Sequence, residues 1–306
     1  MADWDAIIIG GGPAGLTAGL YLCRGGWRTL LLEKASTGGY IMNVETIENY
    51  PGFPEGVIGS ELGMEMKKQA VKYGLTIERG EAIGVQAAPG RKTVTCADGN
   101  SHTALAVIIA GGSTHKKLGV PGEEELHGKG VIYCGFCDGG EFFDMTIAVC
   151  GGGDAGITEA LYMANIAAKV IIIEAMPSLT ATAVLRDRAK ENAKIEIITG
   201  AKVTAITGDG RVTGIEIEGE GGKKEKLATD GVLVHIGLDP NTDYLKGSVP
   251  LDGAGQVKVN QQMEAEIPGI YAAGDIRSGS PRQVSAAVGD GAIAAIAAQR
   301  FLQKIK

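Results

Sequence analysis

The fold is decided by the stretch AIIIGGGPAG, residues 6–15. Its first four residues are a short apolar run of the kind that is buried in a parallel sheet. The next six have the spacing Gly10-x-Gly12-x-x-Gly15, and apolar residues typical of a helix follow through about Arg24. Such glycines permit a tight turn and let backbone amides approach a pyrophosphate at a helix N-terminus. The stretch therefore predicts a strand, a phosphate-binding turn and a helix.

A second predicted strand, residues 29–32, ends at Glu33. In this arrangement an acid at the end of the second strand accepts hydrogen bonds from the ribose of a dinucleotide. The alternative is a glycine-rich turn with a surface glutamate. Because strand, motif, helix, strand and acid occur in the right order, we expect a dinucleotide site. Its residues are Gly10, Gly12, Pro13, Ala14, Gly15 and Glu33.

The same pattern returns in the middle of the chain. A predicted strand, residues 146–150, leads into Gly151, Gly153 and Gly156, and a predicted helix follows them. The next strand ends at Glu174, and the first glycine precedes the acid by 23 positions in both copies (10 to 33 and 151 to 174). Two dinucleotide sites suggest a flavin and a nicotinamide that exchange hydride. We therefore predict an α/β fold with two Rossmann-like domains, the second site formed by Gly151, Gly153, Asp154, Ala155, Gly156 and Glu174.

A pair of cysteines stands just before the second motif, in the stretch YCGFCD at residues 133–138. Two thiols separated by two residues can close a small, reversible disulfide, and exchange through it needs a thiolate with a lowered pKa. The acid Asp138 follows at once. The alternative is two buried cysteines that meet by accident. The sequence thus predicts a redox pair, Cys134 and Cys137, beside a dinucleotide site.

Length and composition limit the remaining classes. The 306 residues suggest two domains, and the net charge of −7 gives no electrostatic footprint for nucleic acid or an anionic membrane. No secretory signal and no membrane-spanning apolar run are visible, so we expect a cytoplasmic protein. Five cysteines and four scattered histidines argue against a structural disulfide framework and against a metal site.

Short strands are predicted after the second motif. Residues 195–198, 203–206 and 212–217 alternate apolar and polar side chains, which suggests a small antiparallel meander. Residues 231–237 form the last buried strand of that half. These strands would complete the second domain.

The C-terminal segment has its own signal. Residues 269–275 predict a strand that ends in Gly274 and Asp275, and residues 283–301 predict an alanine-rich helix. An aspartate at a strand tip can bond a ribityl hydroxyl, while the N-terminus of the helix faces the flavin pyrophosphate. The alternative is an aspartate that only caps the strand.

Together these features resemble the low-molecular-weight thioredoxin reductase family over nearly the whole chain. The landmarks are residues 10–15, 48–52, 110–113, 134–139, 151–156 and 237–242, then Gly274-Asp275 and Arg282-Gln283. The resemblance implies two three-layer ββα domains, with a nicotinamide domain inserted into an FAD domain. The FAD domain would comprise residues 1–113 and 242–306, and the nicotinamide domain, with the redox pair, residues 114–241. Crossings near Ser113-Thr114 and Leu238-Asp239 would act as a hinge between domains.

The resemblance also implies roles for residues. Cys137 matches the thiol that faces the flavin, Cys134 the interchange thiol that attacks the partner disulfide, and Asp138 the acid that passes a proton to the departing thiolate. Electrons would pass from a nicotinamide through FAD to thioredoxin or a thioredoxin-like protein, in a homodimer. The family's motifs add Gly39, Tyr40, Asn49, Gly112, Gly274, Asp275, Arg282 and Gln283 to the FAD site, and Gly237 to the nicotinamide site.

The sequence departs from the family at two places. NADPH-dependent members carry His-Arg-Arg and a further arginine where this chain has EAMPSLT, residues 174–180, and the next basic residue is Arg186, predicted on the following helix. Glu174 would repel a 2′-phosphate and suits the free ribose of NADH, and Gly156 also favours NAD. NADH is therefore expected, and NADPH less so, unless Glu174 is only a solvent-facing strand end. Tyr40 replaces a common glutamine and either contacts the flavin or packs.

Three other functions remain open from the sequence. A ferredoxin-dependent reductase would take single electrons at the flavin, with no reason to keep the second glycine motif. A flavin oxidase that makes disulfides is disfavoured by the same motif. A non-catalytic flavin-binding module is the third, and it would need neither cysteine.

Overall fold

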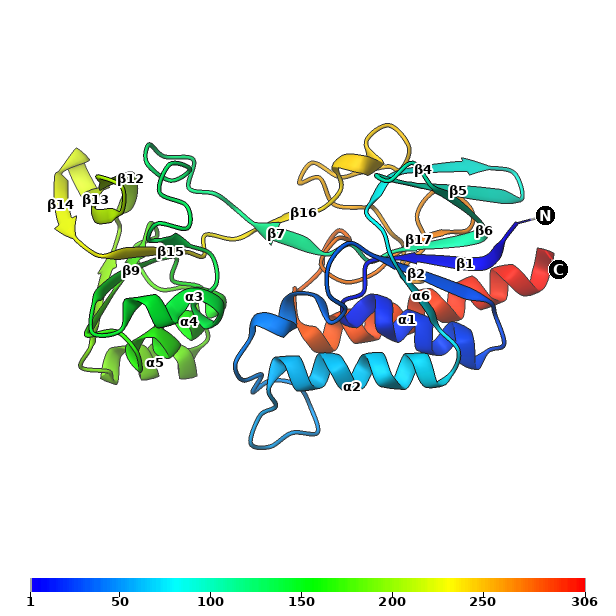
Figure 1. Ribbon diagram of the computed structural model, residues 1–306, viewed down its shortest axis with the longest axis horizontal. Coiled ribbons are helices and arrows are strands. Elements are labelled where there is room, and N and C mark those ends of the chain that lie inside the picture. Colours follow the sequence, from blue (N-terminus) through cyan, green and yellow to red (C-terminus); the bar gives the residue numbers. More distant parts are fainter. Residues whose placement is uncertain (1, 306) are drawn as a thin grey trace. The chain divides into compact units, whose positions relative to one another are not determined.

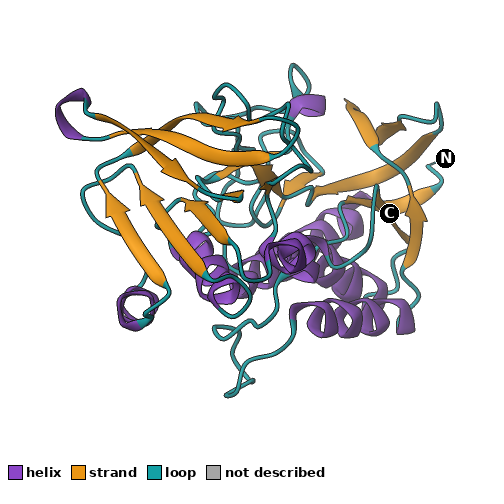
Figure 2. Ribbon diagram, turned by 60° about the vertical axis from the view of Figure 1, so that its left-hand side comes forward, coloured by secondary structure: helices purple, strands orange, loops and turns teal. Residues whose placement is uncertain are grey.

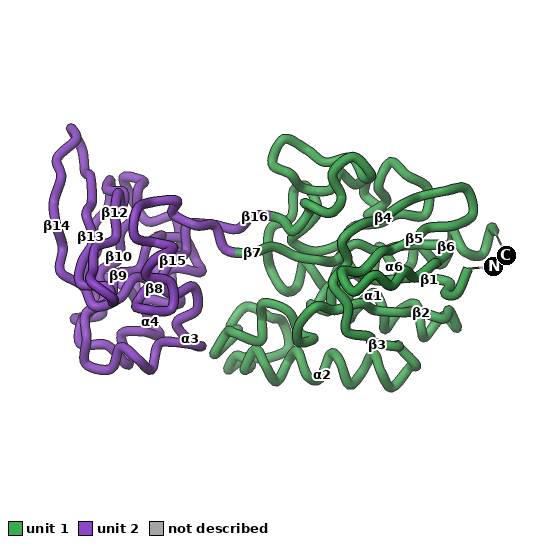
Figure 3. Tube along the Cα trace, turned by 45° about the horizontal axis from the view of Figure 1, so that its top comes forward, with its two compact units in different colours: residues 1–114, 240–306 green, residues 115–239 purple. Residues whose placement is uncertain are grey.

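The computed structural model describes residues 2–305, and the chain divides into two compact units (Figure 3). Unit 1 comprises residues 1–114 and 240–306, and unit 2 comprises residues 115–239. Unit 2 is therefore a continuous insertion in the sequence of unit 1. The two crossing segments, β7 (Ser113–His115) and β16 (Leu238–Pro240), pair with one another as a two-stranded ribbon.

Unit 1 is built on a sheet with the strand order β3-β2-β1-β6-β5-β4, and β17 also pairs with β6. Along the sheet, the neighbours β3, β2, β1 and β6 pair in parallel, and β17 is also parallel to β6. The strand β5 pairs antiparallel with both β6 and β4. The elements are β1 (Trp4–Ile9), α1 (Pro13–Arg24), β2 (Thr29–Glu33), η1 (Gly39–Asn43), α2 (Gly59–Lys72), β3 (Thr76–Arg79), β4 (Ala82–Ala88), β5 (Arg91–Cys96), β6 (Ser101–Ile109), η4 (Asp243–Leu245), β17 (Ile270–Ala272) and α6 (Val284–Ile305).

The two faces of this sheet are buried in different layers. Because successive side chains of a strand point to opposite faces, Ala6 and Ile8 of β1 pack against α1 and α6, whereas Ile7 and Ile9 pack towards β4, β5 and the segment 245–265. The helices α1, α2 and α6 lie side by side along the sheet (Figure 1). The continuous apolar run of β1 thus reflects burial on both faces.

Unit 2 repeats this architecture on a smaller scale. Its parallel sheet has the order β11-β10-β9-β15-β8, and a separate antiparallel meander has the order β12-β13-β14 (Figure 2). The helices α4 and α5 pack on one face of the parallel sheet, and the meander packs on the other. The elements are β8 (Val131–Ile132), α3 (Gly135–Asp138), η2 (Gly139–Phe142), β9 (Thr146–Cys150), α4 (Asp154–Ala164), β10 (Lys169–Glu174), α5 (Ala183–Glu191), β11 (Ile195–Thr199), β12 (Lys202–Gly208), β13 (Val212–Glu218), η3 (Glu220–Gly222), β14 (Lys224–Ala228) and β15 (Gly231–Val234).

One strand assignment from the sequence is wrong. Residues 195–198 do not belong to the meander, because β11 pairs in parallel with β10 at the edge of the main sheet. Its alternation arises because Glu196 faces solvent at that edge and pairs with Lys169, 2.6 Å away. The third strand of the meander is β14, whose polar sequence KEKLA carries little strand signal.

Neither a spanning helix nor a metal cluster is present in the described part of the chain. Among residues 2–305, no helix is long and apolar enough to cross a membrane. Within the same residues, no three His, Cys, Asp or Glu side chains are grouped to hold a metal ion.

Candidate active site

The first glycine motif turns the chain from β1 into α1 within unit 1. Gly10 has a φ of +103°, and a Cβ there would collide with the carbonyl oxygen of Ala110. A Cβ on Gly15 would collide in turn with the carbonyl oxygen of Gly10. Both positions therefore need glycine. Since Gly12 precedes the first residue of α1, Pro13, the turn presents its backbone at the beginning of the helix, where a pyrophosphate binds.

The acid predicted for this site fastens the same turn. Glu33 accepts a hydrogen bond from the amide of Gly11 on Oε2, at 2.7 Å, and one from the amide of Ala35 on Oε1, at 2.8 Å. Each carboxylate oxygen can accept more than one hydrogen bond. Glu33 therefore holds the loop closed and can still accept the hydroxyls of a ribose.

The second motif has the same construction in unit 2. Gly151 has a φ of +117°, and a Cβ there would collide with the carbonyl oxygen of His235, just beyond the end of β15. A Cβ on Gly156 would collide with the carbonyl oxygen of Gly151. Gly153 precedes α4, which begins at Asp154 and Ala155. The two loops are therefore alike in three ways: the same glycines have no room for a Cβ, a helix begins at the same point, and the loop follows the equivalent strand of the sheet.

Glu174 also repeats the role of its counterpart, and it is not a solvent-facing strand end. It is 8% exposed, and it accepts hydrogen bonds from the amide of Gly152 at 2.6 Å and the amide of Met176 at 2.8 Å. A negative charge is thus fixed at the end of β10, beside the glycine loop. This charge favours hydroxyl donors and opposes a phosphate.

The segment after Glu174 folds back onto the loop. The amides of Thr180 and Ala181 donate to the carbonyl oxygen of Gly152, at 2.9 and 3.0 Å, and the amide of Thr182 donates to Asp154 Oδ1 at 2.6 Å. Residues 175–182 contain no Arg, Lys or His. Arg186 lies on α5, as predicted. The segment that borders the second loop therefore has no positively charged side chain.

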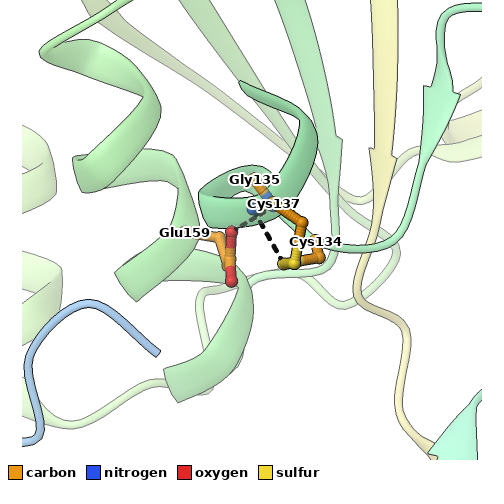
Figure 4. The surroundings of a disulfide bond; sticks show 4 residues. All are labelled: Cys134, Gly135, Cys137 and Glu159. Atoms are coloured by element: carbon orange, nitrogen blue, oxygen red, sulfur yellow. Dashed lines mark hydrogen bonds between the residues drawn. A yellow bond between two sulfur atoms is a disulfide. The ribbon is translucent and has the colours of Figure 1, made fainter. Parts of the chain in front are cut away.

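The redox pair forms a disulfide in a short helical turn of unit 2. Cys134 and Cys137 are bonded with their Cα atoms 5.3 Å apart, and Cys134 directly precedes α3. The Cys137 amide donates to Cys134 Sγ at 3.0 Å (Figure 4). Cys137 and Asp138 are both exposed, and the amide of Asp138 donates to the carbonyl oxygen of Cys134 at 3.1 Å. The disulfide can therefore be approached from outside unit 2.

Gly274 and Asp275 follow β17 and meet the first loop. A Cβ on Gly274 would lie 3.0 Å from the Cβ of Ala14, and the Gly274 amide donates to Asp290 Oδ2 at 3.1 Å. Burial raises the pKa of Asp275 above its ordinary value, while the charge of Arg282 and a hydrogen bond from Ser113 act against this rise. The structure thus brings Gly274, Asp275 and Arg282 to the same end of unit 1 as the glycine loop.

The remaining residues predicted for the FAD site, and Gly237 predicted for the nicotinamide site, lie in several places. Gly39 packs directly on Gly12, since a Cβ on Gly39 would lie 2.9 Å from the Gly12 Cα atom. Asn49 and Gln283, far apart in sequence, are joined by an Asn49 Nδ2 to Gln283 Oε1 hydrogen bond of 2.9 Å. Tyr40 is 41% exposed. Two further glycines lie in the crossing regions: Gly112 accepts from the amide of Asn241 at 3.0 Å, and Gly237 accepts from the amide of Lys116 at 3.0 Å.

Three residues near these sites were missed by sequence reasoning. Asp290 on α6 binds Arg277 through two hydrogen bonds, 2.8 and 2.9 Å long, and so fastens α6 to the loop after β17. Glu159 on α4 accepts from the Gly135 amide at 2.7 Å. Both acids stand in largely apolar helices, but that pattern does not identify the partner of either one. His235 is buried beside Gly151, and burial together with His115 lowers its pKa to about 3.

These features define a class, and the chain belongs to the pyridine nucleotide-disulphide oxidoreductase family, whose model matches residues 4–291. It is a flavin-dependent oxidoreductase with a redox disulfide, and the family implies FAD and a nicotinamide as cofactors. Both glycine loops fit such dinucleotides, because each has the backbone approach that a Cβ would block. The predicted α/β fold with two Rossmann-like domains is confirmed.

Particular relatives narrow this class. The chain is 39% identical over 305 residues to thioredoxin reductase of Listeria monocytogenes, covering 99% of this chain and 95% of that protein. It is 40% identical over 300 residues to thioredoxin reductase of Mycolicibacterium smegmatis, covering 97% and 96%. The crystal structure of thioredoxin reductase from Lactococcus lactis superposes with a TM-score of 0.97 at 36% identity, covering 99% of this chain and 100% of that one. The resemblance to the thioredoxin reductases seen in the sequence is confirmed.

Proposed function

We propose that the protein reduces thioredoxin, or a thioredoxin-like protein, with electrons from NADH that pass through FAD and the Cys134–Cys137 disulfide. The observation that carries this proposal is the disulfide itself, which is closed in a turn with Cys137 exposed, in a chain whose relatives along its whole length are thioredoxin reductases. Exposure matters because the electron donor must reach Cys137 and the partner's disulfide must reach Cys134, which is half-buried.

Each unit has one proposed cofactor. Unit 1 would bind FAD through the loop from Gly10 to Gly15, Glu33 and the region around Asp275, and unit 2 would bind the nicotinamide through the loop from Gly151 to Gly156. In this assignment FAD supplies the carrier that accepts a hydride and passes on two electrons. The chain supplies two fixed loops and an exchangeable disulfide. By resemblance we also propose that the protein is a cytoplasmic homodimer. Light scattering of the purified protein tests whether it is a dimer.

The two cysteines and the following acid have distinct proposed roles. Cys137 accepts two electrons as the S–S bond breaks, and Cys134 is released as a thiolate. Cys134 then attacks the partner's disulfide, forms a mixed disulfide and expels one partner thiolate, which Asp138 protonates. Attack by the Cys137 thiolate on Cys134 expels the second partner cysteine as a thiolate, which takes a proton from solvent, and closes the disulfide again. The amide of Cys137, 3.0 Å from Cys134 Sγ, supports the thiolate at Cys134.

The preference for NADH is supported by the surroundings of the second loop. The buried carboxylate of Glu174 stands at the position where the ribose binds in this class of loop, and residues 175–182 carry no cation to neutralise a 2′-phosphate. NADPH would bring two further negative charges to that carboxylate. We therefore expect kcat/KM to be at least about tenfold lower with NADPH, equivalent to about 1.4 kcal/mol.

The proposal is tested by steady-state reduction of thioredoxin with each nicotinamide, together with anaerobic bleaching of the flavin absorbance. We expect NADH to bleach the flavin and to support turnover, and Cys134→Ser to remove the turnover while the flavin still bleaches. Equal kcat/KM with NADH and NADPH would contradict the proposed preference. A flavin that bleaches only with reduced ferredoxin would instead establish the ferredoxin-dependent reductase.

A further inference from the structure

The turn that carries the redox disulfide is held by a carboxylate from the nicotinamide-site helix. Glu159 lies on α4, which begins at Asp154 directly after the second glycine loop. Its Oε2 accepts a hydrogen bond from the amide of Gly135 at 2.7 Å (Figure 4). The amide of Phe136 donates to the same carboxylate. One side chain therefore binds the first two amides between Cys134 and Cys137.

The packing around Gly135 shows that this contact is built closely into the fold. Gly135 is buried, and a Cβ on it would lie 2.5 Å from Glu159 Oε2 and 3.1 Å from the sulfur of Met163. A Cβ on Gly139, at the other end of the turn, would lie 2.7 Å from the same sulfur. The turn thus rests on α4 through two glycines, with no room for side chains between them.

The amides of the turn are divided between two acceptors. Gly135 and Phe136 donate to Glu159, and Cys137 donates to Cys134 Sγ at 3.0 Å. When the disulfide takes up two electrons, the S–S bond breaks and, with one proton from solvent, yields one thiol and one thiolate. A thiolate on Cys134 would then stand beside a turn whose neighbouring amides already bind a carboxylate.

The state of that carboxylate is sensitive to pH in the physiological range. Burial raises the pKa of Glu159 from 4.5 to about 7, and the hydrogen bonds from Gly135 and Phe136 limit the rise. Both ionised and neutral forms of Glu159 are therefore populated near neutral pH. The ionised form repels a thiolate on Cys134, and the neutral form does not.

We propose that Glu159 is a positioning residue for the redox pair: it holds the turn through the amides of Gly135 and Phe136, and its charge sets how readily Cys134 ionises after reduction. The proposal rests on the proposed role of the disulfide, and it extends that role to a residue on α4. Glu159 has no proposed contact with FAD or with the partner's disulfide. It acts on the two cysteines through the turn between them.

No other charge takes over this role in the surroundings of Glu159. Within residues 2–305, no charged side chain contributes to the shift in its pKa. The ionisable residues on α4 and on the elements packed against it are Cys134 directly before α3; Cys137 and Asp138 on α3; Glu141 on η2; Cys150 on β9; Asp154 and Tyr162 on α4; Lys169 and Glu174 on β10; Arg186, Asp187, Arg188, Lys190 and Glu191 on α5; and Glu196 on β11. Of these, only the cysteines of the disulfide change charge when the protein is reduced.

The test measures the ionisation of Cys134 directly. The full-length protein is reduced with dithiothreitol, freed of it, and alkylated with iodoacetamide between pH 5 and pH 9, with the Cys134 peptide quantified by mass spectrometry. Only the thiolate reacts, so the rate follows its fraction. In Glu159→Gln we expect the midpoint to move to lower pH and the rate at pH 8, where the wild-type carboxylate is mostly ionised, to rise about threefold, as half a pKa unit requires, whereas the rates at pH 5 should coincide. Coinciding profiles would overturn the proposal.

A matched variant separates local from general charge effects. Glu141→Gln removes the same charge from the same unit, at an exposed side chain that pairs only loosely with Arg211, 3.6 Å away. We expect its alkylation profile to match the wild type. A shift as large as that of Glu159→Gln would show a general charge effect and overturn the proposal. Because alkylation needs neither nicotinamide nor thioredoxin, this outcome is independent of whether the proposed function is correct.

A second measurement uses the unaltered protein and does not depend on any variant folding. The amide resonances of Gly135 and Phe136 are followed in the ¹⁵N-labelled, oxidised protein between pH 5.5 and pH 8.5. Since both amides bond the Glu159 carboxylate, we expect both to titrate together with a midpoint near 7. Resonances that stay constant across this range would overturn the proposal.

Discussion

Glu33 and Glu174 show how one residue type does two jobs at the end of a strand. Glu33 accepts hydrogen bonds from the amides of Gly11 and Ala35, and Glu174 accepts them from the amides of Gly152 and Met176, all at 2.6 to 2.8 Å. Removing either acid would therefore loosen the loop as well as change the ribose site. A change of nicotinamide preference is better sought in the exposed residues that follow Glu174.

Arginines at two such positions should admit NADPH. Ala175 and Met176 are both exposed, directly after Glu174. We expect Ala175→Arg/Met176→Arg to raise kcat/KM for NADPH by roughly tenfold, about 1.4 kcal/mol, because guanidinium groups bind phosphate with paired hydrogen bonds. Steady-state kinetics with both nicotinamides measures this. The control Ile83→Arg/Ala87→Arg adds the same charge to exposed positions of β4 in unit 1, and a similar gain there would contradict the explanation.

Glu159 should make the stability of unit 2 depend on pH. Its pKa is about 7 in the folded protein and 4.5 in an unfolded chain, so between these values only the folded state keeps the proton. The stability that this provides is complete below about pH 4.5, falls as the pH rises, and is lost above pH 7, by roughly 3 kcal/mol. Glu159→Gln has no such loss.

We therefore expect the Tm of Glu159→Gln, relative to the wild type, to rise by about a few degrees between pH 5 and pH 8. Thermal unfolding of both proteins in the same buffers measures the difference, which removes the contributions of all other titrating groups. A Tm difference that is constant with pH, or that falls, would show that the carboxyl titrates equally in both states.

At the same scale, the sequence predicts residues whose role depends on spacing and misses those whose partner is distant backbone. Glu174 could be found because its distance from Gly151 repeats that of Glu33 from Gly10. Glu159 could not, because its partner is the amide of Gly135, and an amide has no identity in the sequence. The ion pair of Asp290 with Arg277 is also invisible, since only the fold brings α6 to the loop after β17.

Among the elements, the two glycine turns are the least tolerant of change. Both first glycines have a positive φ and meet a carbonyl oxygen of a neighbouring strand end, Gly10 in unit 1 and Gly151 in unit 2. A methyl group added at either position would clash with that oxygen, and overpacking of this kind costs about 1–3 kcal/mol. The cost falls on the loop that binds the dinucleotide.

Gly10→Ala and Gly151→Ala should therefore have separate effects. We expect Gly10→Ala to weaken FAD binding by about tenfold or more, and Gly151→Ala to weaken nicotinamide binding by a similar factor while the flavin is retained. Flavin content after dialysis and the KM for NADH measure the two effects, and each variant is the control for the other. Loss of flavin from Gly151→Ala would contradict the assignment of one cofactor to each unit.

Elements were predictable where burial follows a simple period. The runs of β1, β2, β9 and β10 are apolar because both faces are covered, and their positions agree closely with the sequence. The edge strand β11 was misplaced because alternation looks alike at the edge of a parallel sheet and in a meander. The short helix α3 was not predicted, since its four residues depend on the bond between Cys134 and Cys137 and on Glu159.

At the scale of the whole molecule, two separate cores should respond to two separate ligands. The clusters of unit 1 and unit 2 share no residues, and each surrounds its own sheet. We expect calorimetry of the flavin-free chain to show two transitions, with FAD raising one and NADH the other, because a ligand stabilises only the unit that binds it. A single transition that both ligands raise equally would show that the units unfold as one.

The insertion of unit 2 into unit 1 also sets an order of events during synthesis. Unit 2 is continuous, and its last strand pairs, β15 with β8 and β9, close within residues 131–234. Unit 1 cannot finish its sheet until β17 pairs with β6, or bury its helices until α6 joins α1, and both arrive only after residue 269. A chain that emerges from the ribosome N-terminus first can therefore complete unit 2 before unit 1. Until β17 and α6 have been synthesised, the sheet of unit 1 is incomplete and one of its faces is not fully covered.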